Sequence, residues 1–164
     1  ISNISRNDLL WNFQNNSANI QSSSTVGEFY MTENPTETTV TEDVATKVLG
    51  TTTAGTLERF TMSANNRLTY IGIAPVRVFC SITLAIKKAG GASQLVNFHV
   101  YKNGTTVSSP TIARTTLKQT GELENLNSQG FVELATGDYI EVWVTNTTSA
   151  TGITVDTMNF TAYY

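Results

Sequence analysis

Apolar and polar residues alternate along most of the chain from Val26 onward, which is the period expected of half-buried β-strands. The longest alternating run follows Pro75 and places six apolar side chains on one face: Val76, Val78, Cys80, Ile82, Leu84 and Ile86. The opposite face of this segment carries Arg77, Phe79, Ser81, Thr83 and Ala85. A strict period of two over this length predicts a long strand with one face in the core.

The same pattern predicts shorter strands, at residues 26–31, 57–62, 67–71, 95–101, 111–117, 131–134, 139–145 and 153–162. The Thr- and Val-rich stretch 38–49 favours one or two more, whereas residues 51–55 and the polar stretch 120–129 are predicted to be loops. Asn103-Gly104 suits a type I′ hairpin turn, Asn65-Asn66 suits a second turn, and Pro110 is expected at a strand edge or bulge. About nine or ten short strands with regular turns predict an all-β antiparallel sandwich over residues 26–164.

Residues 1–25 have a different pattern of apolar and polar residues. Leu10, Phe13, Ser17 and Ile20 recur at helical spacing, but Asn is frequent and residues 21–25 are polar. We interpret this segment as an N-terminal arm or short helix followed by a linker, with a frayed tail as the equal alternative. The chain starts at Ile1 rather than Met, so we expect a processed product or one domain of a longer polypeptide.

Composition excludes several classes of function. The 164 residues carry a net charge of −3, only 14% are charged, and no basic stripe exists to bind a nucleic-acid backbone. No apolar run reaches the roughly twenty residues that cross a membrane. We therefore expect no nucleic-acid partner and no membrane insertion. Cys80 is the sole cysteine and is predicted to be a small buried side chain that forms no disulfide within the chain.

Nothing in the sequence indicates an enzyme, a metal site or a cofactor. His99 is the sole histidine, and its alternation with Phe98 and Val100 predicts an outward, surface or interface position. No Cys/His spacing fits zinc, and no Asp-rich loop fits calcium. We therefore expect no catalytic residue, no metal and no cofactor.

The C-terminal third carries the most specific motif. A Leu134-Ala135-Thr136-Gly137-Asp138 corner precedes the alternating stretch 139–145, and the chain closes with the aromatic-rich stretch 158–164. This arrangement resembles the closing strands of C1q/TNF-like jelly rolls. The Thr- and Asn-rich texture, including residues 57–72, looks more like phage or viral surface proteins. The resemblance implies a jelly roll that assembles as a homotrimer with apolar and aromatic residues along its threefold axis.

The resemblance also implies a function. We expect a non-enzymatic structural protein at the virion surface, a homotrimeric head-decoration, spike or fibre-knob domain whose arm docks to other virion proteins, with host attachment as a further role. The alternative is a carbohydrate-binding module or receptor-binding tip that takes a host-surface glycan or receptor. A secreted C1q/TNF-like signalling ligand with a protein receptor is a third interpretation.

Aromatic residues are the best candidates for a binding site. Tyr139 and Trp143 lie four residues apart on one predicted strand face, Tyr163 lies in the last strand, and Trp11 lies in the arm. Such side chains suit a subunit interface and equally suit stacking on a sugar. Burial in the core is the remaining alternative. For Trp143→Ala we expect trimerisation to weaken more than folding does.

Overall fold

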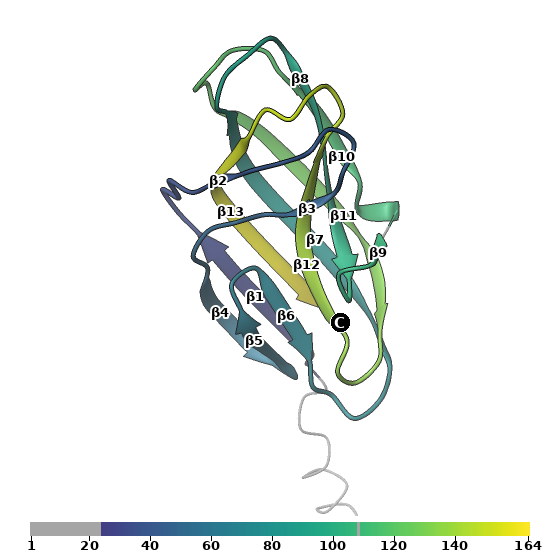
Figure 1. The fold of residues 1–164 in the computed structure, drawn as a ribbon. Helices are drawn as coiled ribbons and strands as arrows, with labels where there is room; N and C mark the ends of the chain where they lie inside the picture. The colour runs from purple at the N-terminus through teal and green to yellow at the C-terminus, as the bar shows by residue number, and fades with distance from the viewer. Residues whose placement is uncertain (1–23, 108) are drawn as a thin grey trace, which may run out of the picture.

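The computed structural model describes residues 24–107 and 109–164, which form a sandwich of two antiparallel β-sheets (Figure 1). Sheet A has the order β11 (Glu124–Leu134), β7 (Val76–Lys88), β13 (Ile153–Tyr163), β1 (Val26–Met31) and β4 (Thr53–Glu58), and β2 (Glu37–Thr38) pairs with β13. Sheet B has the order β10 (Ala113–Leu117), β8 (Gln94–Lys102), β12 (Tyr139–Asn146), β6 (Arg67–Tyr70) and β5 (Phe60–Ala64). Two short strands extend sheet B, β3 (Thr46–Lys47) beside β12 and β9 (Thr106–Val107) beside β8. The predicted all-β jelly-roll sandwich is confirmed.

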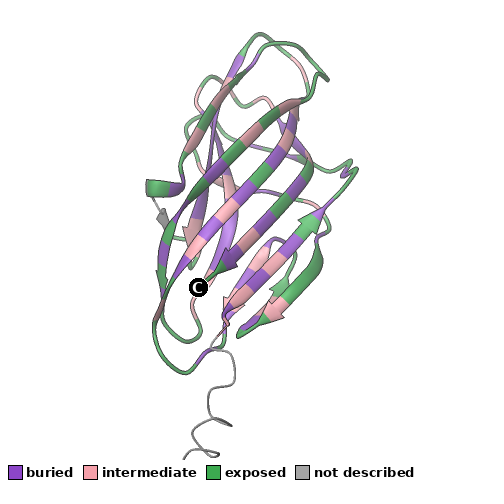
Figure 2. Cartoon of the chain, turned by 180° about the vertical axis from the view of Figure 1, so that it is seen from behind, coloured by how far each residue is buried: buried purple, intermediate pink, exposed green. Residues whose placement is uncertain are grey.

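The core lies between the inner faces of the two sheets. In β7 the inward side chains Val78, Cys80, Ile82, Leu84 and Ile86 are at most 1% exposed, as the alternation predicts. Sheet B contributes Val96, Phe98 and Val100 from β8 and Ile140, Val142 and Val144 from β12, all fully buried. Figure 2 shows the resulting alternation of buried and exposed residues along the strands. Burial also raises the pKa of the Cys80 thiol to about 12, so Cys80 is an inert core residue.

Several local predictions are confirmed. The strands expected at residues 26–31, 95–101, 139–145 and 153–162 form β1, β8, β12 and β13 with their ends shifted by at most one residue. The Asn103-Gly104 turn joins β8 to β9 with φ of 54° and 66°, the two positive values that a type I′ turn requires. At the second predicted turn, between β5 and β6, Asn66 has φ of 52°.

The predicted polar loop 120–129 is wrong from Glu124 onward, because this stretch begins the eleven-residue strand β11. β11 pairs with β7 along its whole length, from Glu124 opposite Ile86 to Leu134 opposite Val76. The outer face of sheet A is open to solvent, so the outward side chains of β11 remain in water and can be Asn and Gln. The inward face of this part of β11 also lacks a strong apolar pattern, because the buried Ser128 occupies one of its positions.

Three smaller predictions also fail. Residues 53–55 of the expected loop 51–55 belong to β4, an edge strand that is mostly exposed and therefore lacks an apolar signal. The expected strand 57–62 is interrupted at Arg59, whose φ of 60° turns the chain from β4 in sheet A to β5 in sheet B. Pro110 lies in a 3-10 turn, η1 (Ser109–Thr111), rather than in a strand, because its ring fixes φ and removes a donor.

The predicted arm or helix over residues 1–25, with Trp11, lies outside the described residues apart from its last two positions. Within the described part, no helix is long and apolar enough to span a membrane. The same part of the chain contains no group of three or more His, Cys, Asp or Glu side chains placed to hold a metal ion.

Candidate functional site

The structure separates the predicted aromatic candidates onto two opposite faces. Tyr163 projects from the outer face of sheet A, on β13. Tyr139 and Trp143 project from the outer face of sheet B, on β12, with the buried Glu141 between them. The core of the sandwich lies between the two faces. These residues therefore cannot form one continuous patch within a single chain.

An aromatic row, defined here as Phe131, Phe79 and Tyr163, crosses the outer face of sheet A. The three residues are direct cross-strand partners on β11, β7 and β13. Their rings meet edge to face, with centroids 5.2 Å apart for Phe131 and Phe79 and 5.5 Å apart for Phe79 and Tyr163. Phe131 is 49% exposed and Tyr163 47% exposed, so the row presents apolar surface to solvent.

The row begins on the edge strand β11 and continues from β13 toward the opposite edge of sheet A. Val26 on β1 is the next cross-strand partner of Tyr163. On the β11 side the guanidinium of Arg77 lies 4.9 Å from the centroid of the Phe131 ring. The C-terminal Tyr164, 73% exposed, follows the row directly. This end of sheet A is therefore the most aromatic exposed region that the structure describes.

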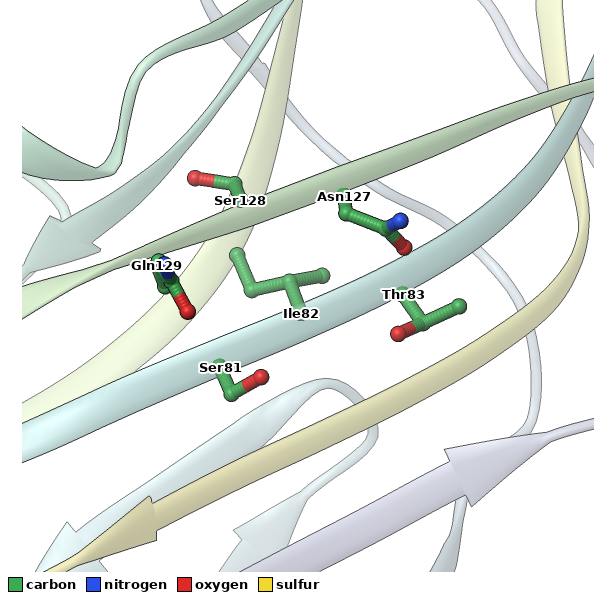
Figure 3. A pocket seen from close by; sticks show the side chains of 6 residues that line it. All are labelled: Ser81, Ile82, Thr83, Asn127, Ser128 and Gln129. Atoms are coloured by element: carbon green, nitrogen blue, oxygen red, sulfur yellow. The ribbon is translucent and has the colours of Figure 1, made fainter.

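Beside the row lies a polar strip of uncharged side chains on the same face of sheet A. Its members face outward from β7, β11 and β13: Ser81, Thr83, Asn127, Gln129, Asn159 and Thr161. A shallow depression of about 430 Å³ opens between β7 and β11 over this strip, and Figure 3 shows the side chains that line it. Charged groups lie beyond both ends of this face: the Lys87–Asp156 ion pair beyond the strip, and Arg77 opposite Glu133 beyond the aromatic row.

The aromatic row was only partly visible in the sequence. Tyr163 was identified, whereas Phe79 and Phe131 were assigned to outward or ordinary strand positions without further meaning. The signal that could have found them is parity, because Phe79 is the one large apolar side chain on the mostly polar outward face of β7. The alignment of Phe131 with Phe79 depends on the register between β11 and β7, which the predicted loop at 120–129 concealed.

The outer face of sheet B is organised around the buried carboxylate of Glu141, whose side chain is 1% exposed. Its Oε1 accepts hydrogen bonds from Lys47 Nζ and Arg67 Nε, both at 2.7 Å, and its Oε2 accepts one from Trp143 Nε1 at 3.0 Å. Burial, the largest influence, acts to raise the pKa of Glu141, but these hydrogen bonds outweigh it and hold the pKa below its ordinary 4.5. The three partners thus keep a buried charge satisfied.

The aromatic rings of this face contact one another rather than solvent alone. Trp143 stacks on Tyr101 with centroids 4.5 Å apart and an angle of 20° between the rings. Arg67 lies over the Tyr139 ring at 4.0 Å from its centroid. Each of these rings therefore already has a partner on one face, which reduces what remains for a sugar to stack on.

His99 faces outward on β8 as predicted, yet it is buried, at 7% exposure, and is not a surface residue. Its Nε2 lies 3.2 Å from the hydroxyl of Thr145, while Nδ1 has no hydrogen-bond partner among the described residues. Burial lowers the pKa of His99 below 6.5, so the ring is neutral near neutral pH. The neighbouring β12 covers it, because Trp143 is its cross-strand partner.

Glu141 makes stability depend on pH, and the sign follows from its lowered pKa. A carboxyl whose pKa is lower in the folded state stabilises the fold above the unfolded pKa, and this stabilisation is lost as pH falls through the folded pKa. We expect Glu141→Gln to lower the free energy of unfolding by about 1–3 kcal/mol near neutral pH. The difference from the unsubstituted protein should shrink on acidification below about pH 4.5. Urea unfolding followed by circular dichroism at several pH values checks this, and a pH-independent difference would contradict it.

Comparisons with known proteins agree on the fold. No protein-family model and no curated protein sequence matches the chain. Among solved structures, it is similar to the insect Eiger TNF from S. frugiperda, with a TM-score of 0.52 and 11% identity over 86% of this chain and 92% of that one. It is also similar to murine APRIL, with a TM-score of 0.51 and 9% identity over 85% of this chain and all of that one. At this identity the likeness shows the fold alone, a TNF-like jelly roll.

Proposed function

We propose that this protein is a non-enzymatic structural protein that acts by self-association through the outer face of sheet A. The observation that carries the proposal is the exposed aromatic row beside the uncharged polar strip. Aromatic side chains are enriched in the buried centres of protein interfaces, where charged residues are depleted. This face has that composition, with aromatic rings at one end and Ser, Thr, Asn and Gln side chains across its middle.

The proposed assembly is a homotrimer. The stoichiometry rests on the resemblance of the C-terminal corner and last strand to C1q/TNF-like jelly rolls, and the TNF-like fold agrees with it. A stable interface buries about 800 Å² per partner, or roughly 20–30 residues a side. Uncharged Ser, Thr, Asn and Gln side chains cost less to desolvate than charged ones, so this face can be buried against another copy of the chain.

We further propose that the trimer lies on a virion surface as a head-decoration, spike or fibre-knob domain. The Thr- and Asn-rich texture with only 14% charged residues supports this location. The segment before β1 joins the domain beside Tyr163, the cross-strand partner of Val26. Residues 1–25 would then dock the trimer to other virion proteins. Labelling of purified particles by an antibody to this chain tests the location, and its absence from particles would exclude it.

The alternative, binding of a host glycan, places the site on sheet B at Tyr139 and Trp143. The occupied ring faces of these residues make it the weaker proposal. Titration with a panel of soluble glycans, followed by tryptophan fluorescence, discriminates between the two. A saturable change that Tyr139→Ser, which keeps the tryptophan reporter, abolishes would favour glycan binding over assembly as the primary role.

Light scattering after size-exclusion chromatography tests the proposed assembly of the unsubstituted chain. We expect a solution mass near three times 17.8 kDa that persists on dilution into the micromolar range. A stable dimer would retain self-association but exclude the trimer. A monomer at every concentration would refute the proposed function.

A further inference from the structure

The turn between β8 and β9 contains Asn103-Gly104, the sole Asn-Gly dipeptide in the sequence. Asn followed by Gly is chemically labile, because glycine has no side chain to hinder attack of its backbone nitrogen on the preceding side-chain amide. Asn103 is exposed, so water can reach it. The type I′ turn requires both residues at positive φ, and the sequence that builds the turn therefore introduces a reactive pair.

The fold holds the Asn103 side chain at both of its polar atoms. Nδ2 donates to Oδ1 of Asp138 at 2.8 Å, and Oδ1 accepts from the backbone N–H of Tyr139 at 3.0 Å. The backbone N–H of Asn103 also donates to the carbonyl of Tyr139 at 2.9 Å. These contacts, called here the Asn103 clasp, join the β8–β9 turn to the corner that precedes β12.

Asp138 is itself held firmly in place. Its Oδ2 accepts from the backbone N–H of Ala135 at 2.8 Å and forms an ion pair with Lys102 Nζ at 2.7 Å. Lys102 Nζ also donates to the backbone carbonyl of Glu133 at 2.9 Å. Since Lys102 lies in sheet B and Glu133 in sheet A, the same group of residues fastens the two sheets together at this end.

We propose that Asn103 is a site of deamidation whose rate is controlled by the clasp with Asp138. In the reaction the backbone nitrogen of Gly104 forms a bond to Cγ of Asn103 and loses its proton. The Cγ–Nδ2 bond breaks, and ammonia leaves. Water then opens the resulting succinimide at either carbonyl, giving aspartate or isoaspartate. Cγ can approach the Gly104 nitrogen only when both side-chain hydrogen bonds of the clasp are broken, so the folded state protects Asn103.

The aspartate or isoaspartate formed at position 103 is expected to weaken the contacts at this end of the sandwich. Deamidation replaces the donor Nδ2 with a carboxylate oxygen that faces Oδ1 of Asp138, and two like charges at that distance repel. The new carboxylate also competes with Asp138 for Lys102, which loosens the fastening to Glu133. The modification is irreversible and needs no partner, so the inference is independent of the proposed function.

Peptide mapping by mass spectrometry, after incubation of the full chain at mildly alkaline pH, measures the reaction. We expect Asp138→Ala to accelerate deamidation of Asn103 by about tenfold or more, the factor that corresponds to losing a charge-assisted hydrogen bond. Lys102→Met removes the ion pair but leaves the clasp, and should react close to the unsubstituted rate. Asn127-Ser128, in strand β11, is the internal reference.

A second comparison tests the proposal even if Asp138→Ala folds poorly, because it uses only the unsubstituted protein. The unsubstituted protein is compared in buffer and in urea, where we expect the unfolded chain to react at least about tenfold faster. Equal rates in the folded and unfolded chain, or in a folded Asp138→Ala variant and the unsubstituted protein, would overturn the proposal.

The effect of the product on stability has its own test. Asn103→Asp should lower the melting temperature more than Asn103→Ala, although Asp tolerates positive φ better than Ala. The reverse order would refute the repulsion.

Discussion

Replacing Phe131 and Tyr163 together with serine is expected to convert the assembled protein into a folded monomer. Both side chains are about half exposed in the single chain, at 49% and 47%, so they contribute little to its core. In an interface they would be buried aromatic anchors, each worth about 2 kcal/mol or more. Their joint loss corresponds to a roughly thousandfold weaker association. Light scattering after size-exclusion chromatography reports the mass, and thermal unfolding reports the fold.

The matched control lies on the opposite face. Tyr139→Ser removes a partly exposed tyrosine from sheet B, and we expect its assembly to match that of the unsubstituted protein. Trp143→Ala is also expected to keep the assembly and instead to lose stability, since Trp143 stacks on Tyr101 and donates to Glu141. This revises the expectation from the sequence, in which Trp143 was an interface candidate. Monomers from Tyr139→Ser with intact assembly of the double variant would reverse the assignment of faces.

The second large effect is on stability, and it concerns Asn66. This side chain is fully buried and pairs with the backbone of β12 as a strand would. Its Nδ2 donates to the carbonyls of Val142 at 2.7 Å and Val48 at 3.0 Å, and its Oδ1 accepts from Val142 N–H at 3.0 Å. Asn66→Ala would remove all three hydrogen bonds and add strain at φ 52°, although the Val142 carbonyl would still accept the backbone N–H of Val48 at 3.1 Å. We expect a loss of about 3–5 kcal/mol in the free energy of unfolding.

Two further variants separate the causes at Asn66. Asn66→Gly relieves the positive φ but still removes the hydrogen bonds, and is expected to cost most of what alanine costs. Asn66→Asp keeps the acceptor for Val142 N–H and loses the donor to the two carbonyls. Urea unfolding measures all three variants. If glycine restored nearly full stability, backbone strain rather than hydrogen bonding would explain the effect.

The sequence predicts best those strands that have one apolar face and one polar face. β7 has a buried face of apolar residues and a mostly polar outer face, so the period of two is visible without the structure. The turn at Asn103-Gly104 is similarly local, because its positive φ values depend on those two residues alone. The corner at Gly137, with φ of 89°, belongs to the same class.

The parts that sequence reasoning missed depend on partners far away in the chain. β4 and the part of β11 before Phe131 are edge segments whose outward side chains carry no apolar signal, so their hydrogen bonding to β1 and β7 defines them. Asn66 was predicted as a turn residue for its backbone, but its side chain acts on Val142, 76 positions later. Glu141 occupies an outward position and is nevertheless buried, because Lys47, Arg67 and Trp143 surround its carboxylate.

The residues of the candidate site also divide into features that the local sequence predicts and features that depend on distant strand pairing. Parity placed Tyr163 and Trp143 outside the core, and both lie there. Parity alone does not say that they belong to different sheets, nor that Phe131 and Phe79 align with Tyr163. That alignment is a matter of register between β11, β7 and β13, which share no local sequence signal.

Hydroxyl-radical footprinting tests most directly whether the outer face of sheet A is the assembly interface. The assembled protein is compared with Ser81→Arg, which keeps the aromatic row, places a charge in the polar strip and is expected to be monomeric, as light scattering of the same sample checks. We predict that Phe131 and Tyr163 become strongly protected in the assembly, while Tyr139 and Trp143 react equally in both states. Protection of Tyr139 and Trp143 with Phe131 and Tyr163 unchanged would contradict the account.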